Sequence, residues 1–195
     1  MPSRGNLRLP APVLLCVDIQ QEHLAPGRQH AVTEAAQVLS NCGTVLARWR
    51  QRLWPVAHLK RVAQAAWFNP ASVLTDWVPD CRPAPGEMTF EHPMPSAYSS
   101  PRFCEYVANL GVTRCIVIGF SLEEAILATA VEGFHRGQDL VVIDEAAACT
   151  RPAACDLNIY RSIIFDLLKN YAAVETLESA LLFAQTGHLC MSTLH

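Results

Sequence analysis

Apolar runs of strand length recur along the chain, separated by segments whose apolar residues follow a helical spacing. RCIVIGF (114–120) and DLVVIDEA (139–146) are almost continuously apolar, which is typical of strands buried on both faces of a parallel sheet. Four further runs are interpreted as strands, at residues 13–20, 53–60, 87–92 and 172–176.

Helices are expected where apolar residues recur every three or four positions. Pro101 suits the first turn of a helix that Gly111 ends, and Gly137 is placed to end another. The expected helices are 31–52, 101–110, 122–136 and 156–169, with a last one after residue 176. Strands and helices in this order predict an α/β fold, a three-layer doubly wound domain with a mainly parallel sheet of five or six strands.

No internal repeat, low-complexity tract or linker divides the chain. We therefore expect a single domain over residues 1–195, with its core at about 11–178. A proline-rich insertion at 62–86 fits neither period. Three of its aromatic residues could wall a ligand pocket or a subunit contact, and the pattern does not choose between these roles: Trp67, Phe68 and Trp77.

Composition and charge exclude several classes of function. Of the 195 residues, 51% are hydrophobic and 17% are charged, which is a globular balance. The net charge is −3 and no basic stripe is present, so nucleic acid is not an expected partner. The apolar runs are too short to span a membrane. The first run reaches Asp18 after five residues, which is too short for a signal-peptide core, and we expect a cytoplasmic protein.

The eight cysteines contain no CxxC pair, and the closest two are six positions apart. Without a secretion signal, we interpret them as reduced thiols that are mostly structural. The histidines are scattered and form no pair with metal-ligand spacing, so neither a metal nor another cofactor is expected.

Polar residues near the predicted strand ends form the candidate site, because doubly wound folds bind ligands at the carboxyl ends of their strands. A carboxylate that ends a buried strand is costly unless it is paired or protonated, so we expect a functional or formerly functional role for Asp18. Asp144 is expected to organise a loop. The remaining candidates are His58 or Lys60, His92 and the turn at Phe120-Ser121.

Four motifs in order carry a resemblance to a known family. They are CVDIQ (16–20), HPMPSAYSSPRFCEYVANLGV (92–112), VIGFSLEEAILATA (117–130) and IDEAAAC (143–149). In composition and mutual distance they resemble the isochorismatase-like hydrolases, a family that includes nicotinamidases, carbamoyl amidohydrolases and isochorismatases. The resemblance spans about residues 11–178 and implies the same fold, a small-molecule substrate and a homo-oligomer.

The resemblance also implies a catalytic layout, and this chain departs from it. Family amidases use an Asp, a neighbouring Lys and a Cys nucleophile at a helix start, positions that match Asp18, His92 and Ala125 here. The turn at Phe120-Ser121 matches the one that helps to form the oxyanion hole. Alanine has no lone pair with which to attack a carbonyl, so ordinary cysteine amidase chemistry is not expected.

Other side chains near these positions have simpler interpretations. Glu123 and Glu124 suit the first turn of a helix because carboxylates interact favourably with its dipole. Ser121 is a poor substitute for the missing nucleophile, since no base is assigned to it, and the family layout gives Cys149 no such role. His92 could partner Asp18 or could be a half-buried structural histidine. Lys60 could fill the space of the family lysine, from another strand.

Three functions remain open. The chain could be a cysteine-independent hydrolase with Asp18 as acid or base, since isochorismatases in this family also lack the cysteine when they hydrolyse a vinyl ether. It could be catalytically silent and bind a small ligand or a protein. Alternatively, Ala125 could be an engineered replacement of a native cysteine, although His92 argues against a simple Cys-to-Ala knockout.

Overall fold

The computed structural model describes residues 11–111, 114–150 and 152–186. Six strands form one sheet in the order β3-β2-β1-β4-β5-β6, and every pairing is parallel. This confirms the predicted doubly wound α/β fold, and it places the reversal of strand order between β1 and β4. The strands are β1 (Val13–Val17), β2 (Val56–Arg61), β3 (Met88–His92), β4 (Arg114–Phe120), β5 (Asp139–Ala148) and β6 (Ala173–Glu175).

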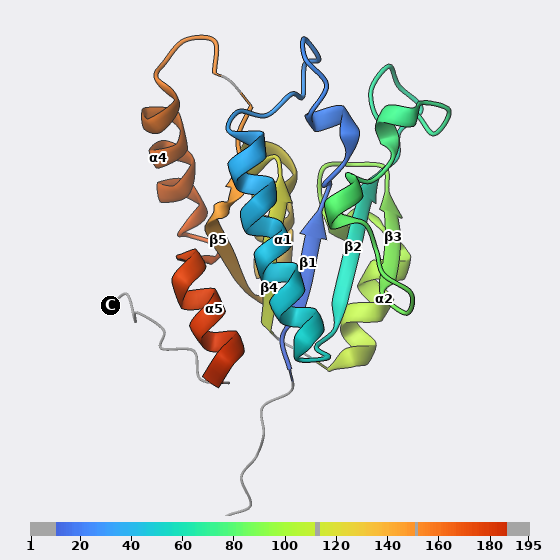
Figure 1. The fold of residues 1–195 in the computed structure, drawn as a ribbon, viewed down its shortest axis with the longest axis vertical. Helices are drawn as coiled ribbons and strands as arrows, with labels where there is room; N and C mark the ends of the chain where they lie inside the picture. Colours follow the sequence, from blue (N-terminus) through green and yellow to red (C-terminus); the bar gives the residue numbers. More distant parts are fainter. Residues whose placement is uncertain (1–10, 112–113, 151, 187–195) are drawn as a thin grey trace, which may run out of the picture.

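Helices cover both faces of the sheet and complete the three layers (Figure 1). The helices α1 and α5 lie on the face turned toward the viewer, and α2, α3 and α4 supply the apolar side chains of the other face. Their bounds are α1 (Ala35–Gln51), α2 (Pro101–Leu110), α3 (Leu127–His135), α4 (Leu157–Leu168) and α5 (Leu177–Thr186).

The core is divided by the alternation of side chains along the strands. On β1, Leu14 and Cys16 join the cluster under α1 and α5, whereas Val13, Leu15 and Val17 join the cluster under α2, α3 and α4. All five side chains are fully buried. A strand that is apolar on both faces is therefore explained by its position in the middle of the sheet.

Several predicted elements have different boundaries in the structure. The first strand ends at Val17 because Asp18 adopts a left-handed backbone conformation, with φ of 49°. The helix predicted at 122–136 is two elements: η5 (Leu122–Ile126) is a turn of π-helix, and α3 follows it. A single π-helical turn at a helix start is often found at functional sites.

Gly119 allows β4 to approach β1 closely at the edge where the strands end. Its φ is 129°, and a Cβ at this position would collide with the carbonyl oxygen of Val17. Any side chain would therefore displace the backbone immediately before Asp18.

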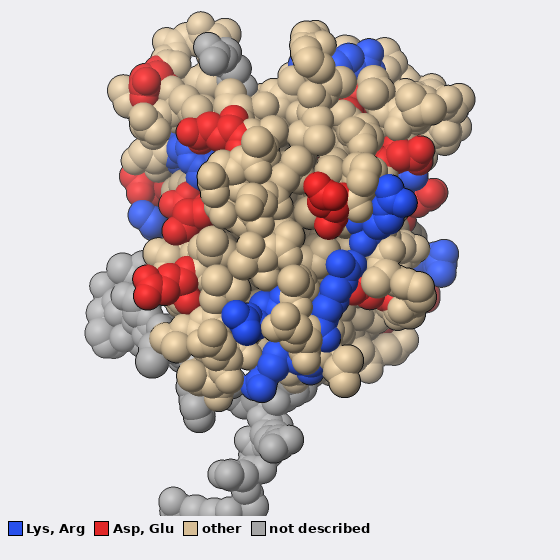
Figure 2. All heavy atoms as spheres, viewed as in Figure 1, with Lys and Arg blue, Asp and Glu red and all other residues tan. Residues whose placement is uncertain are grey.

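Charged side chains are distributed unevenly over the face shown in Figure 2. Lys and Arg form a narrow diagonal band on the lower right of this view, and acidic side chains lie mainly to the left and above. Within the described residues, no helix is long and apolar enough to cross a membrane. The seven described cysteines are unpaired, whereas Cys190 and the N-terminal residues 1–10 lie outside the described residues.

Candidate active site

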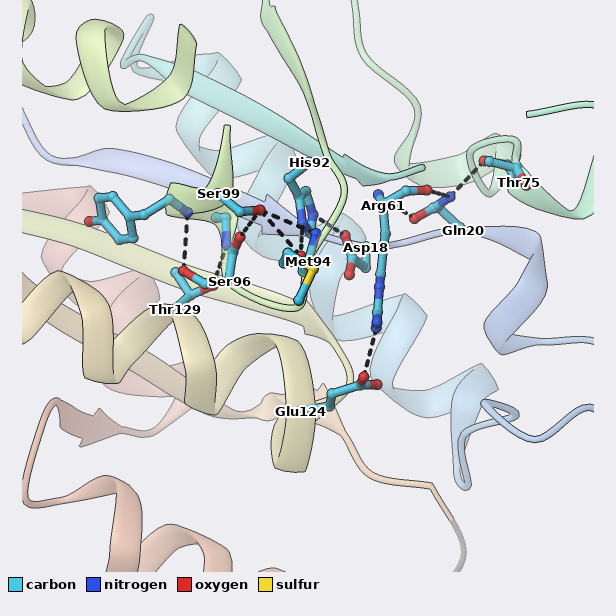
Figure 3. Close-up of polar contacts among 12 residues, drawn as sticks. Asp18, Gln20, Arg61, Thr75, His92, Met94, Ser96, Ser99, Glu124 and Thr129 are labelled. Carbon is cyan, nitrogen blue, oxygen red and sulfur yellow. Dashed lines mark hydrogen bonds and ion pairs between the residues drawn. The ribbon is translucent and has the colours of Figure 1, made fainter. Parts of the chain in front are cut away.

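Asp18 and His92 meet at the carboxyl edge of the sheet (Figure 3). Asp18 follows β1 and His92 ends β3, and the His92 Nε2 atom lies 2.7 Å from the Asp18 Oδ1 atom. Both residues are 0% exposed. Of the two interpretations left open for His92, contact with Asp18 is the one present, although the residues are 74 positions apart in the chain.

Hydrogen bonding defines how many protons this pair holds. The His92 Nδ1 atom lies 2.7 Å from the carbonyl oxygen of Met94, which can only accept, so Nδ1 carries a hydrogen. The contact between Nε2 and Asp18 then needs one further proton, on either the imidazole or the carboxyl group. Burial lowers the pKa of His92, but the charge and hydrogen bond of Asp18 outweigh it and leave that pKa raised. The Asp18–His92 pair thus shares a single proton.

Arg61, which sequence analysis did not identify, brings a positive charge close enough to act on His92. Its Nη1 atom donates to Glu124 Oε1 at 2.8 Å, and its guanidinium lies 4.9 Å from the centroid of the Phe68 ring. Gln20 holds the backbone of Arg61 by accepting from its N–H at 2.8 Å and donating to its carbonyl oxygen at 3.1 Å. Gln20, the last residue of the CVDIQ motif, therefore positions Arg61.

Glu124 connects Arg61 with a second missed residue, His30. The His30 Nδ1 atom lies 3.4 Å from Glu124 Oε2. Contact with His30, together with hydrogen bonding from Arg61, lowers the pKa of Glu124 to about 2. The role predicted for Glu124 from the helix dipole alone was therefore incomplete, because its carboxylate has two specific partners.

The position at which the resemblance implies a nucleophile is buried and apolar. Ala125 is 1% exposed and packs in the core cluster beneath η5. Phe120 and Ser121 are also buried, and the peptide bond between them is cis. The Ser121 Oγ atom is buried without a partner in the described part of the chain. Ala125 therefore supplies no thiol at this position.

Hydrogen bonds of two side-chain hydroxyls link the Ser-Ala motif (Ser96-Ala97) to the helix that carries the Thr-Ala motif (Thr129-Ala130). The Thr129 hydroxyl accepts from the Ala97 N–H at 3.0 Å, and the Ser96 hydroxyl donates to Glu132 at 2.6 Å. The bond between Ala97 and Thr129 joins the loop after His92 to α3, as Figure 3 shows. These motif residues hold the loop that follows His92.

Two predicted candidates lie on the opposite face of the sheet. His58 is buried and its Nε2 atom lies 2.8 Å from Glu87 Oε2. Lys60 lies 3.5 Å from Asp76 and 5.7 Å from the centroid of the Trp77 ring. The suggestion that Lys60 fills the space of the family lysine is wrong, because alternation along β2 turns Lys60 away and Arg61 toward the site.

The other candidates have structural contacts. Asp144 accepts from Arg161 of α4 at 2.5 Å, in agreement with its expected organising role. Glu123 accepts from the Thr150 N–H at 3.0 Å and so holds the end of β5. Burial raises the pKa of the Cys149 thiol to about 12, which disfavours the nucleophilic thiolate form at neutral pH.

Two of the three aromatic residues in the insertion surround the candidate site. Phe68 is 2% exposed and contacts the rings of His23 and His30, at centroid distances of 5.3 and 5.1 Å. Trp67 contacts His30 at 5.7 Å, whereas Trp77 packs on the other face. Among the described residues, no group of three or more His, Cys, Asp or Glu side chains could hold a metal ion.

Comparison with known families agrees with this geometry. The model of the isochorismatase domain matches residues 12–163, which include the two strands that flank the switch point and all the residues of the site. The chain belongs to the isochorismatase domain family. The family match therefore agrees with the predicted fold and covers the residues of the candidate site.

Individual relatives of this isochorismatase-family chain are distant. It is 23% identical to the secreted isochorismatase effector Isc1 of Verticillium dahliae, over 69% of this chain and 70% of the relative. An isochorismatase from Pseudomonas putida superimposes with a TM-score of 0.81 at 21% identity, covering 91% of this chain and 93% of that one. A cysteine hydrolase from Pseudomonas syringae pv. phaseolicola gives 0.83 at 13%, covering 96% and 100%. These structural matches support the fold.

Proposed function

We propose that this chain is a thiol-independent hydrolase in which the Asp18–His92 pair moves a proton and water is the nucleophile. The observation that carries the proposal is the 2.7 Å contact between His92 Nε2 and Asp18 Oδ1, with His92 Nδ1 already committed to Met94. A buried pair that shares one proton can act as an acid and then as a base. The absence of a nucleophile at Ala125 is compatible with this chemistry.

The substrate class that suits such a site is a small vinyl ether. Its hydrolysis needs a proton on carbon and then addition of water, and neither step forms an acyl-enzyme. The relatives named as isochorismatases favour the same class. Arg61 supports an oxygen-rich substrate, because its Nε atom is buried without a partner in the described residues and can donate to a carboxylate or carbonyl oxygen.

The test is hydrolysis by the wild-type protein and by Asp18→Asn, on a panel that holds isochorismate and several small amides. We expect release of pyruvate from isochorismate and a loss of at least about 10²-fold in kcat for Asp18→Asn, the scale of general acid–base catalysis. Asp166→Asn is the matched control, since Asp166 is exposed and lies on α4. Amide turnover by pure wild-type protein would contradict the proposal.

A catalytically silent protein that binds a small ligand is the second candidate. Burial favours it, because the side chains of Asp18 and His92 are at most 1% exposed and Ala125 is 1% exposed. Access to the site therefore requires movement of the surrounding residues. Silence across the panel, combined with ligands that raise the melting temperature, would support this candidate over the hydrolase.

The remaining expectations stay predictions. The expectation of a homo-oligomer rests on the family resemblance alone. Sedimentation of the purified protein would measure its oligomeric state. The expected cytoplasmic location rests on sequence, and the Verticillium dahliae relative is named as secreted. Whether Ala125 is an engineered replacement of cysteine is decided by sequencing codon 125 of the natural gene.

A further inference from the structure

A second buried histidine lies beside the candidate site and has no part in the Asp18–His92 pair. His23 belongs to η1 (Gln21–His23), immediately after the CVDIQ motif, and is 1% exposed. Its backbone is held on both sides: its N–H donates to the Gln20 carbonyl at 3.1 Å, and its own carbonyl accepts from Val32 at 2.9 Å. The ring is therefore placed by the same turn that follows Asp18.

The hydrogen bonds of His23 define its tautomer. Its Nδ1 atom lies 2.8 Å from the carbonyl oxygen of His30, so Nδ1 carries the hydrogen. In the neutral ring Nε2 is then a lone-pair acceptor. This Nε2 atom is fully buried and has no partner among the described residues. An unpaired buried acceptor destabilises the fold, and a bound molecule that donates a hydrogen bond to it removes that cost.

The surroundings of His23 place this acceptor at the site. Its ring centroid lies 5.6 Å from that of Phe120, which ends β4, and 5.3 Å from that of Phe68. Asp18 is close enough for its charge to act on the imidazole. Two further buried atoms without described partners come from the same strand ends, Asp18 Oδ2 and Ser121 Oγ. Donors and acceptors thus remain unpaired at one edge of the sheet.

We propose that His23 Nε2 binds the hydrolytic water and accepts its proton, as the general base that this chain uses in place of a thiol. The inference rests on the proposed hydrolase function. Three features combine in it: a fixed tautomer, a buried lone pair, and a position against the turn that follows β4. A neutral imidazole with these features is suited to the task.

Each group of the protein that gives or takes a proton returns to its starting protonation state by the end of one turnover. The Asp18–His92 pair gives its shared proton to the vinyl carbon, and the ether carbon becomes an oxocarbenium ion. Water forms a new C–O bond to that carbon, and its proton goes to His23 Nε2. In the collapse of the hemiketal the bond to the leaving oxygen breaks, and that oxygen takes the proton from His23. The hemiketal hydroxyl returns its proton to the Asp18–His92 pair, so both groups regain their starting states.

This assignment gives activity an acid limb. Burial lowers the pKa of His23; the charges of Asp18 and Glu124 oppose that shift and the charge of His30 adds to it. His23 is therefore neutral at pH 7 and loses its acceptor as pH falls below 6.5. The raised pKa of His92 sets an alkaline limb on the other side.

The test compares kcat and its pH profile for wild-type, His23→Gln and His23→Phe proteins with isochorismate. Glutamine can still donate to the His30 carbonyl and hold water, but it cannot take a proton; phenylalanine retains only the packing. We expect kcat to fall by about 10²-fold or more in both variants and the acid limb to disappear, with the alkaline limb retained. His135→Phe, on the exposed end of α3, is the matched control.

The outcomes separate the inference from the proposed function. Turnover by wild type with an unchanged acid limb in His23→Gln would overturn the role of His23 and leave the hydrolase intact. No turnover by wild type would remove the hydrolase, and ¹⁵N NMR of the histidines then decides on the acceptor. If His23 Nε2 is unprotonated at pH 7, it remains an acceptor for a bound molecule. If it is protonated, the assignment of His23 Nε2 as an acceptor is overturned. Near-ultraviolet circular dichroism checks that each variant is folded.

Discussion

Two buried histidines contact carboxylates on opposite faces of the same sheet, and their surroundings differ. His58 lies 2.8 Å from Glu87, and His92 lies 2.7 Å from Asp18. Glu87 also accepts two hydrogen bonds from Arg50, at 2.7 and 2.8 Å, and one from the Ala84 N–H at 2.8 Å. Its lone pairs are occupied, and the cluster ties α1 to the segment that precedes β3.

Asp18 has far fewer partners. Its Oδ2 atom is buried without a partner in the described residues, and no Arg or Lys donates to it in the contacts found there. The difference also appears in the histidines: burial lowers the pKa of His58, whereas the charge and hydrogen bond of Asp18 leave that of His92 raised. A carboxylate that is saturated with donors stabilises the fold, and one with spare acceptors is suited to chemistry.

The largest effect on this comparison is expected from Gly119→Ala. The new methyl group would collide with the Val17 carbonyl and force φ out of 129°, so it would displace β1 directly before Asp18. We expect a loss of about 3 kcal/mol or more in the free energy of unfolding, measured with urea. Gly43→Ala is the control, because nothing lies within 4 Å of a Cβ there and the helix should gain up to about 1 kcal/mol. Equal stability of the two variants would contradict the packing of β4 on β1.

Glu87→Gln is expected to give the next largest effect. The change leaves Arg50 and His58 without their anion, and because Arg50 is partly exposed we expect a loss of about 2 kcal/mol. Burial alone would raise the pKa of Glu87, but hydrogen bonds from Arg50, Ala84 and His58 lower it to about 2. Its contribution is thus complete above pH 4.5 and is lost as pH falls toward 2.

The measurement is urea unfolding between pH 2 and 7 for wild type, Glu87→Gln and the exposed control Glu91→Gln. The acid-dependent part should be smaller in Glu87→Gln alone, and turnover should be retained. Loss of turnover without loss of stability would reverse the roles assigned to the two clusters.

The smallest effect is the pH dependence that the two histidines contribute near neutrality. His92 has a raised pKa, so its stabilisation is complete below pH 6.5 and is lost as pH rises through the folded value. His58 has a lowered pKa, so its neutral form is favoured in the folded chain and stability falls as pH drops below 6.5. His92→Asn should remove the alkaline part and His58→Asn the acidic part of the unfolding profile. Identical profiles for the two variants would contradict this opposition of signs.

Much of the fold could be predicted because strands buried on both faces and helices ended by glycine leave strong local patterns. The helix at 101–110 and the strand at 114–120 have the predicted bounds. The Asp18–His92 contact could be proposed because both residues end strands whose carboxyl ends share one edge.

The rest of the site could not be predicted because it depends on residues outside periodic segments. His23 and His30 lie in irregular chain after β1, where the contact of His23 Nδ1 with the His30 carbonyl and the packing of both rings against Phe68 bring them together. Arg61 was overlooked in favour of Lys60, although the alternation of side chains along β2 already separates the two. The π-helical turn at Leu122–Ile126 leaves no distinct apolar period, so a continuous helix was expected.

Gln20 hydrogen-bonds two points of the chain, Arg61 and Thr75, and this has a consequence for the segment between them. Its amide bonds the backbone of Arg61 and, at 2.7 Å, the carbonyl of Thr75, so the segment between those residues leaves and rejoins the domain at one side chain. That segment carries Trp67 and Phe68 against the two histidines of the loop after β1. A change in the length or the rings of this segment would therefore act on the candidate site through Phe68 and through the bond from the Val62 N–H to the His92 carbonyl, while the pairing of the strands does not depend on it.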